Sequence, residues 1–446
     1  MAQRMNLLGE PGVGPATGPG RPVPSRADVR EGLWQACGAF ITLVIALAVL
    51  AVGSLVDRHP SQDVVTGPHG PFPAAFADGA PVAPEHVIRR RAELQVLAHG
   101  LSLRWVGSGL AAVNLRTGKE YWRYERRDAD RTLFSFEASE RTVVAGFDDG
   151  RLVGVDLRGG GPLWSAKVPR EKGFRLVELV GGQAVTSAPG AVRAFGERDG
   201  RSLWTMRTPA SCPEVLLYSV HALPDHLSAV QVMCNVVTPD RGEYSLLLGV
   251  DDRTGEVLWR RRTVDPKQTA WGDEHTLLAP DRNDEGTVRS LDVNRRGAFP
   301  RHAFPRDELD IVAAGGGTVV SGTDPGDGSA YRDTLLRAYD TRDGRLSWRL
   351  PAPDGQEYGF PVIADGRVYV VRRRLITEAD VGRPLGADLL VLEAATGRLL
   401  HTLALPAQTV RDDDEYFEKL DVTDTADGAL SIERRDGEGT LLVATD

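Results

Sequence analysis

One short pattern recurs along most of this chain and decides its fold. The stretch VNLRTGKEYW at residues 113–122 contains an apolar strand, a Thr-Gly turn and a tryptophan four residues after the glycine. The same arrangement returns in VDLRGGGPLW (155–164), AFGERDGRSLW (194–204), VDDRTGEVLW (250–259) and AYDTRDGRLSW (338–348). Five tryptophans in one register indicate a structural repeat.

Two weaker copies extend the series. LEAATGRLLH (392–401) has His401 at the tryptophan position, and LDVNRRGAFP (291–300), around Asp292, has slipped by one residue. The shortest spacings between copies are close to the ~40–45 residues that a four-stranded propeller blade needs. The residues assigned to the repeat are Trp122, Trp164, Trp204, Trp259, Trp348, Gly118, Gly160, Gly200, Gly255, Gly344 and Gly397.

The chemistry of the pattern explains these residue types. Glycine supplies the positive φ of a tight turn between strands, and the indole is large enough to fill the gap between neighbouring sheets. The dipeptides Asp149-Gly150 and Asp365-Gly366, between alternating apolar runs, predict further hairpins. We therefore predict an all-β propeller. Seven motif copies and an extra C-terminal strand pair favour eight blades over seven, with residues near 84–91 supplying the missing outer strand.

These residues resemble the pyrroloquinoline-quinone (PQQ) type of propeller repeat. Quinoprotein dehydrogenases and the lipoprotein that scaffolds outer-membrane barrel assembly share this repeat, and the resemblance covers about residues 90–446. The dehydrogenases pair a vicinal disulfide with the quinone and hold calcium beside a catalytic Asp. This chain has no adjacent cysteines and no matching ligand set. It therefore resembles the scaffold more than the enzymes, and neither PQQ nor calcium is expected.

The N-terminal region has a separate organisation. Residues 1–31 are rich in Gly, Pro and Ala, which predicts a disordered tail. Residues 33–56 carry no charge and are long enough for a membrane-spanning helix. Residues 57–85 are interpreted as an extracytoplasmic linker, and residues 86–446 as the propeller.

Arginines around this segment set its orientation. Arg21, Arg26 and Arg30 precede it and only Arg58 follows closely, which favours a cytoplasmic N-terminus and an exported propeller. The length favours an uncleaved plasma-membrane anchor over a signal peptide, although cleavage stays open. Cys37 lies at the beginning of the apolar run and does not suit lipid attachment.

Composition restricts the function. The net charge of -9 argues against a nucleic-acid binder. The scarcity of lysine among the 53 basic residues is typical of a high-GC genome, such as that of a high-GC Gram-positive bacterium.

Two cysteines lie outside the apolar segment. Cys212 and Cys234 flank a predicted hairpin whose turn is centred near Leu223-Pro224, so that the two thiols are roughly opposite each other. In an oxidising compartment we expect a disulfide. The alternative is two unrelated buried thiols.

One loop approaches the spacing of a calcium site. In DRNDEGTVRSLD (281–292) the oxygen ligands would be Asp281, Asn283, Glu285 and Asp292. Glu at the fifth position and Asp at the twelfth depart from the pattern, which favours an acidic hairpin turn. Asp412 to Glu415 is interpreted as a solvated loop, and the histidines show no ligand spacing.

No catalytic or cofactor-binding residue is assigned. The expected function is a membrane-anchored scaffold that binds an envelope or secreted protein, or a wall glycan, through propeller loops. The alternative is a quinone-dependent dehydrogenase or a quinone-binding redox sensor. A signalling receptor is disfavoured because the cytoplasmic segment is short.

Overall fold

The computed structural model describes residues 63–90, 96–126, 132–169, 176–209, 212, 215–234, 244–263, 269–281, 284–305, 310–322, 334–375, 380–409, 420–434 and 440–445. The chain divides into two units, Met1–Ser61 and Gln62–Asp446, and all described residues belong to the second. The predicted tail and the predicted span at 33–56 lie outside them. Within the described part of the chain, no helix is long and apolar enough to cross a membrane.

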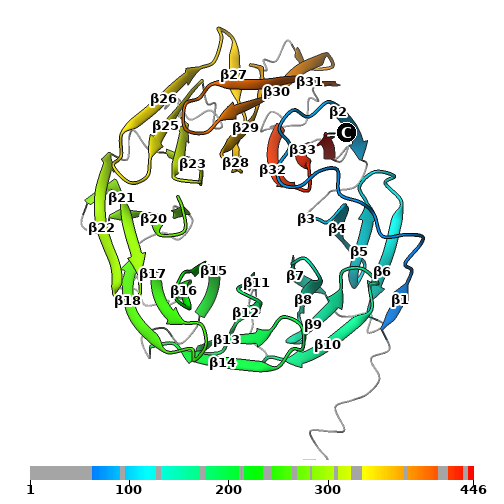
Figure 1. Cartoon of the computed structure of the whole chain (residues 1–446), viewed down its shortest axis with the longest axis vertical. Helices are drawn as coiled ribbons and strands as arrows, with labels where there is room; N and C mark the ends of the chain where they lie inside the picture. Colours follow the sequence, from blue (N-terminus) through cyan, green and yellow to red (C-terminus); the bar gives the residue numbers. More distant parts are fainter. Residues whose placement is uncertain are drawn as a thin grey trace, which may run out of the picture. The chain divides into compact units, whose positions relative to one another are not determined.

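The second unit is a ring of eight antiparallel sheets, or blades, around a central opening (Figure 1). Blades one to four consist of β3 (Val96–Ala98), β4 (Leu101–Val106), β5 (Gly109–Asn114) and β6 (Glu120–Glu125); β7 (Leu133–Ala138), β8 (Thr142–Phe147), β9 (Arg151–Asp156) and β10 (Pro162–Lys167); β11 (Val177–Val180), β12 (Gln183–Ala188), β13 (Ala191–Gly196) and β14 (Ser202–Arg207); and β15 (Val215–Leu223), β16 (Leu227–Cys234), β17 (Tyr244–Asp251) and β18 (Val257–Thr263).

The other half of the ring follows the same order from the inside outward. Blades five to seven consist of β19 (Ala270–Trp271), β20 (Thr276–Asp281), β21 (Asp284–Asn294) and β22 (Gly297–Pro305); β23 (Asp310–Gly315), β24 (Thr318–Gly322), β25 (Leu335–Asp340) and β26 (Leu346–Pro351); and β27 (Gln356–Tyr358), β28 (Val362–Ala364), β29 (Arg367–Arg374), β30 (Pro384–Glu393) and β31 (Leu399–Thr409). Blade eight contains β32 (Leu420–Ala426), β33 (Ala429–Arg434) and β34 (Thr440–Ala444).

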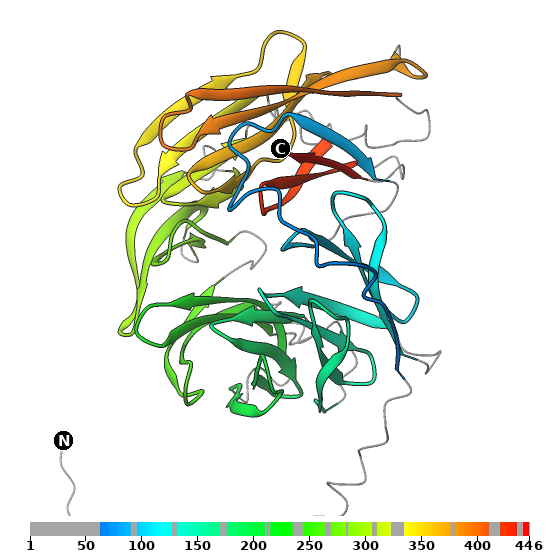
Figure 2. The same cartoon turned by 45° about the vertical axis from the view of Figure 1, so that its right-hand side comes forward.

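The outer strand of blade eight comes from the other end of the chain. β2 (His86–Arg90) pairs with β34, with His86 opposite Ala444 and Arg90 opposite Thr440. Figure 2 shows β2 beside the C-terminal strands. The predictions of eight blades and of an outer strand near residues 84–91 are thus confirmed. Because β2 completes the last sheet, the ring is closed without a long unpaired edge between its ends.

Residues 63–85 bind along the ring before β2 begins. β1 (Val64–Thr66) adds a fifth strand to blade one by pairing with β6. Farther along, the Ala80 N–H donates to Asp365 at 2.6 Å and the Tyr369 hydroxyl donates to the Pro81 carbonyl at 2.7 Å, both in blade seven. For residues 63–85 the linker interpretation is therefore corrected: the segment is a strap across blades one, eight and seven, since the backbone N–H groups of Phe76 and Ala77 also donate to the Asp427 carbonyl of blade eight. A segment rich in glycine and proline is compatible with a flexible linker, but in this protein these residues lie in turns of fixed conformation.

The repeated tryptophans join neighbouring blades. Trp122 is fully buried and its Nε1 donates to the Leu157 carbonyl of the next blade at 2.7 Å. A Cβ on Gly160 would lie 2.8 Å from the Trp122 ring, so the turn glycine is required for this contact as well as for its positive φ. The equivalent bonds are Trp164 to Glu197 at 2.7 Å, Trp204 to Asp252 at 2.9 Å, Trp259 to Asn294 at 2.8 Å and Trp348 to Ala394 at 2.7 Å.

Histidines take this position where tryptophan is missing. His302, in the slipped copy, lies on the turn glycine Gly344 of blade six. His401 of blade seven contacts the carbonyl of Pro84 at 2.9 Å. The one-residue slip in LDVNRRGAFP thus brings His302, and not Arg301, to the blade junction.

The predicted disulfide joins Cys212 and Cys234, with Cα atoms 5.0 Å apart. Its detailed geometry differs from the expectation. Val215, and not Cys212, is opposite Cys234 in the hairpin, because the turn is centred on Asp225, with Leu223 opposite Leu227, and not near Leu223-Pro224. Cys212 precedes β15 and is fully buried.

Candidate interaction surface

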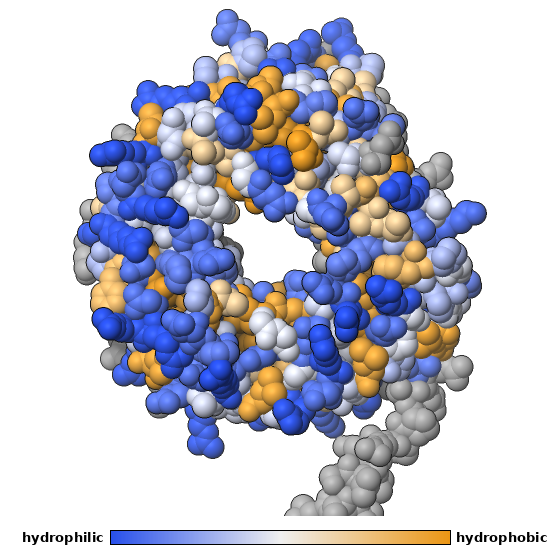
Figure 3. Space-filling view, viewed as in Figure 1, coloured by the Kyte–Doolittle hydropathy of each residue, from blue (hydrophilic) through white to orange (hydrophobic). Residues whose placement is uncertain are grey.

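A central opening lies between the blades (Figure 1, Figure 3). The first strands of the blades, among them β3, β7, β11, β15 and β32, surround it (Figure 1). The opening persists when side chains are drawn, and its rim is mainly hydrophilic on the face in view (Figure 3). The side chains of the inner strands therefore determine the chemical character of the surface that a partner would contact in the opening.

Half-buried carboxyl groups lie on the inner strands along one side of the opening. Glu137 on β7 and Glu178 on β11 each have a pKa raised to about 7, foremost because burial disfavours the charged form. Asp424 on β32 adds to the shift of Glu137, and Glu137 adds to that of Glu178. Burial also raises the pKa of Asp424, against hydrogen bonds from the backbone N–H groups of Leu97 and Thr425. Blades eight, two and three thus form one electrostatically coupled acidic wall.

Aromatic rings occupy another part of the inner strands. His221 of β15 stacks on Trp271 of β19, with ring centroids 4.1 Å apart and an interplanar angle of 12°. Burial lowers the pKa of His221, while Glu274 and Asp273 oppose that shift. A neutral imidazole stacked on an indole stabilises the junction of blades four and five.

A hollow of about 570 Å³ lies between blades five and six. Its lining includes Asp292, Arg301 and Arg342. Arg301 is paired with Asp292 at 2.8 Å, and Arg342 lies 4.0 Å from Asp273. Both guanidinium groups already face carboxylates, and Glu274 adds a third carboxylate to the lining, so the hollow carries a small excess of negative charge.

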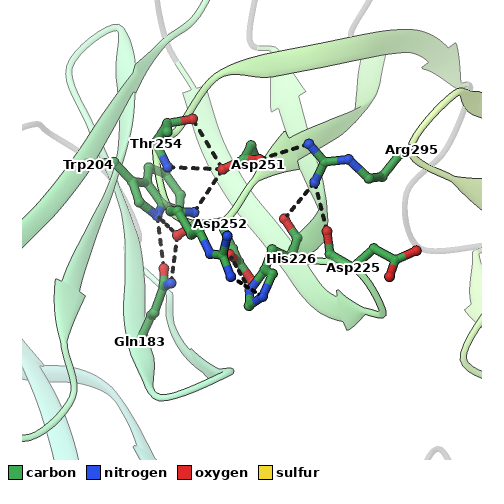
Figure 4. A network of polar contacts seen from close by, with 9 residues as sticks. Gln183, Trp204, Asp225, His226, Asp251, Asp252, Thr254 and Arg295 are labelled. Atoms are coloured by element: carbon green, nitrogen blue, oxygen red, sulfur yellow. Dashed lines mark hydrogen bonds and ion pairs between the residues drawn. The ribbon is translucent and has the colours of Figure 1, made fainter.

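A polar network at the turns of blades four and five is structural. Arg295 donates to the Asp251 carboxylate at 2.9 Å and to the Asp225 carbonyl at 2.7 Å (Figure 4). The bond from Arg295 is the main cause of the lowered pKa of Asp251. His226 lies 3.4 Å from the side-chain carboxylate of Asp252. The backbone carbonyl of Asp252 accepts a hydrogen bond from the Trp204 indole. The network holds turns of successive blades together.

The calcium-loop hypothesis does not match the strand register. Asp281 pairs with Asp284 across a hairpin, whereas Asp292 lies opposite Thr276 near the far end of β21. The backbone of the segment is a turn and a strand, which separates residues 281 and 292 along the hairpin. Asn283 lies outside the described residues, as do the side chains of Asp281 and Glu285. Within the described part of the chain, no three His, Cys, Asp or Glu residues are grouped as metal ligands.

Sequence reasoning missed the carboxyl wall. Glu137 and Glu178 lie on the inner strands of successive blades, and ring closure brings Asp424 of blade eight to the same side of the opening. A local signal existed, because Glu137 and Glu178 are charged residues within otherwise apolar strands. The acidic stretch at 412–415 lies outside the described residues.

The fold and repeat define the class as an eight-bladed propeller of PQQ-like repeats. The family model described as outer membrane protein assembly factor BamB matches residues 90–189 and 247–438. These ranges are more than half of the chain, so this protein belongs to that family.

Individual relatives are distant. The outer membrane protein assembly factor BamB of Burkholderia pseudomallei is 26% identical over an alignment of 184 residues, and the match covers 37% of this chain and 43% of that protein. The match therefore spans less than half of the relative's length.

Solved structures with a similar fold are more distant in sequence. BamB from Moraxella catarrhalis is 14% identical, with 81% of this chain and 98% of that chain covered and a TM-score of 0.48. A europium-containing methanol dehydrogenase is 13% identical, with coverages of 76% and 84% and a TM-score of 0.42. We draw no functional argument from these two likenesses.

Proposed function

We propose that this chain is a non-enzymatic scaffold, anchored in the plasma membrane by residues 33–56, whose exported propeller binds another polypeptide of the cell envelope. Membership of the BamB family supports a scaffold, since the relative is named as an assembly factor. The observation that carries the proposal is the closure of the eight-bladed ring by β2 and β34.

Closure matters because recognition by loops needs a fixed frame. Five blade junctions are each held by an indole N–H bond to the next blade, and His401 contacts the strap at a sixth. The repeat residues therefore serve to join neighbouring blades. Loops and the central opening can then vary in chemistry without altering the ring.

The disulfide supports an exported location. Bonds such as Cys212–Cys234 persist in oxidising compartments and are rare in the cytosol. The uncharged run at 33–56 and the arginines before it give the same orientation. Export of the ring places its faces among envelope and secreted proteins.

Crosslinking of the full-length chain in intact cells tests the scaffold. We expect a specific envelope polypeptide to be captured by the native chain. Capture should be lost in Gly255→Val, because a Cβ at residue 255 would lie only 2.8 Å from the Cβ of Trp204, while the anchor is unchanged. Equal capture by both chains would contradict the proposal. Dye reduction by the native chain with PQQ, calcium and an alcohol would favour the dehydrogenase instead.

A further inference from the structure

The strap determines the point at which the N-terminal segment joins the ring. Asp63 is the first described residue, and its carboxylate accepts the Tyr124 hydroxyl at 2.6 Å. The next three residues pair with β6 in register, Val64 opposite Glu125 and Thr66 opposite Arg123. The chain therefore enters the ring at blade one, at the end of β6 remote from the Gly118 turn.

Little chain is left between this point and the predicted span. Only residues 57–62 separate the span from Asp63. Seven extended Cα–Cα steps reach about 25 Å. If residues 33–56 cross the bilayer, as the proposed function requires, blade one is the blade tethered nearest to the lipid.

The same corner of blade one exposes a tryptophan. Trp105 lies near the end of β4, beside the Gly107-Ser108 turn, and is 50% exposed, whereas Trp122 of the same blade is fully buried. Trp105 lies opposite Leu110, Leu110 opposite Tyr124, and Tyr124 opposite Val65, which is itself 39% exposed. Three strand spacings place Trp105 about 14 Å from Val65 in the sheet.

Two arginines at this corner are paired. Arg126 binds the Asp149 carboxylate through two bonds of 3.1 Å, and Arg123 pairs with Glu120 at 2.6 Å and with Glu125 at 3.3 Å. The Asp63 carboxylate accepts the Tyr124 hydroxyl. A corner with paired arginines and an exposed indole suits the membrane interface, where tryptophan is favoured because it has an apolar body and one N–H donor.

We propose that the corner of blade one formed by Trp105 and Val65 docks on the lipid headgroup layer of the anchoring membrane. The inference rests on the proposed anchor. Docking fixes the orientation of the ring, with blade one at the bilayer and blade five, on the opposite side of the ring, directed away from it (Figure 1). The indole inserts among headgroups while the strap holds the distance.

Photocrosslinking of the full-length chain tests the docking. Benzoylphenylalanine replaces Trp105 in one variant and Phe299 in a matched control, since Phe299 is 47% exposed but lies in β22 of blade five, just after the Gly297 turn. Both are reconstituted in vesicles of phosphatidylcholine and phosphatidylglycerol and irradiated. We expect several-fold more lipid adduct at position 105 than at position 299, with the disulfide intact in both chains.

Two failures are distinguishable. If alkaline carbonate released the chain from the membrane, both the proposed anchor and the proposed docking would be contradicted. A chain that stays in the membrane with equal lipid labelling at both positions would overturn the docking alone. Repetition in native membranes adds one more outcome, because adducts of position 105 with a protein and not with lipid would also overturn it.

Discussion

The ring nitrogen Nε2 of His401 lies 2.9 Å from the carbonyl oxygen of Pro84, although 317 residues separate them in the chain. This contact occupies the position at which other blades use an indole and the carbonyl of the next repeat. The next blade has no such repeat, and the strap provides the carbonyl instead. The seal between blade seven and the closing strand thus depends on a histidine.

Loss of this contact should weaken closure. We expect His401→Ala to lower the free energy of unfolding by about 1–2 kcal/mol, from a lost hydrogen bond and lost packing. Thermal unfolding followed by circular dichroism measures it. Leu399→Ala, on the same strand and 54% exposed, should change little. Equal losses of unfolding free energy in both variants would show that His401 has no special role in closure.

The indole N–H should matter apart from the bulk of the ring. Trp122→Phe keeps an aromatic side chain against Gly160 but leaves the Leu157 carbonyl without its donor. We expect a loss of about 2–3 kcal/mol, since this position is fully buried. In the half-exposed control Trp105→Phe, chemical denaturation should show a much smaller change. A near-zero effect at Trp122 would mean that the ring's volume alone joins the blades.

Glu137 should make stability depend on pH. Its pKa is about 7 in the folded chain and 4.5 ordinarily, so the folded state holds a proton that the unfolded state has lost between these values. This contribution to stability is fully present below pH 4.5 and is lost as the pH rises through 7. We therefore expect Glu137→Gln to raise the melting temperature at pH 8 and to have little effect at pH 4.5.

A surface carboxylate provides the comparison for that series. Glu393 is exposed, and its pKa is lowered by hydrogen bonds from Thr396 and Arg398. Glu393→Gln should show no gain at pH 8. If Glu137→Gln were equally neutral at both pH values, water or a bound cation would be neutralising the wall.

The disulfide should stabilise blade four. Reduction, or Cys234→Ala together with Cys212→Ala, is expected to cost about 2–4 kcal/mol, because the bond closes a loop over a sequence separation of 22. Denaturant unfolding with and without reductant measures this in the native chain. The double variant should not respond to reductant. An unchanged midpoint in the native chain would show that packing of β15 on β16 suffices.

The ring was predictable because its signal is local and repeated. Each turn glycine and its tryptophan lie within one short motif, and even the outer strand at 84–91 could be inferred from a missing partner. The strap was not predictable, since Ala80 and Asp365 are bonded through a backbone N–H that carries no side-chain signature. The acidic wall depends in part on closure, because Asp424 joins Glu137 and Glu178 only when the last blade lies beside the first.

Pairing of the early strand β2 with the last strand, β34, determines when the ring can close during biosynthesis. A ribosome releases His86 long before Ala444, so β2 has no partner until nearly the whole protein has been made. Contacts so distant along the chain form slowly. During that interval the incomplete ring exposes two unpaired sheet edges, and a chaperone that binds nascent chains would recognise them.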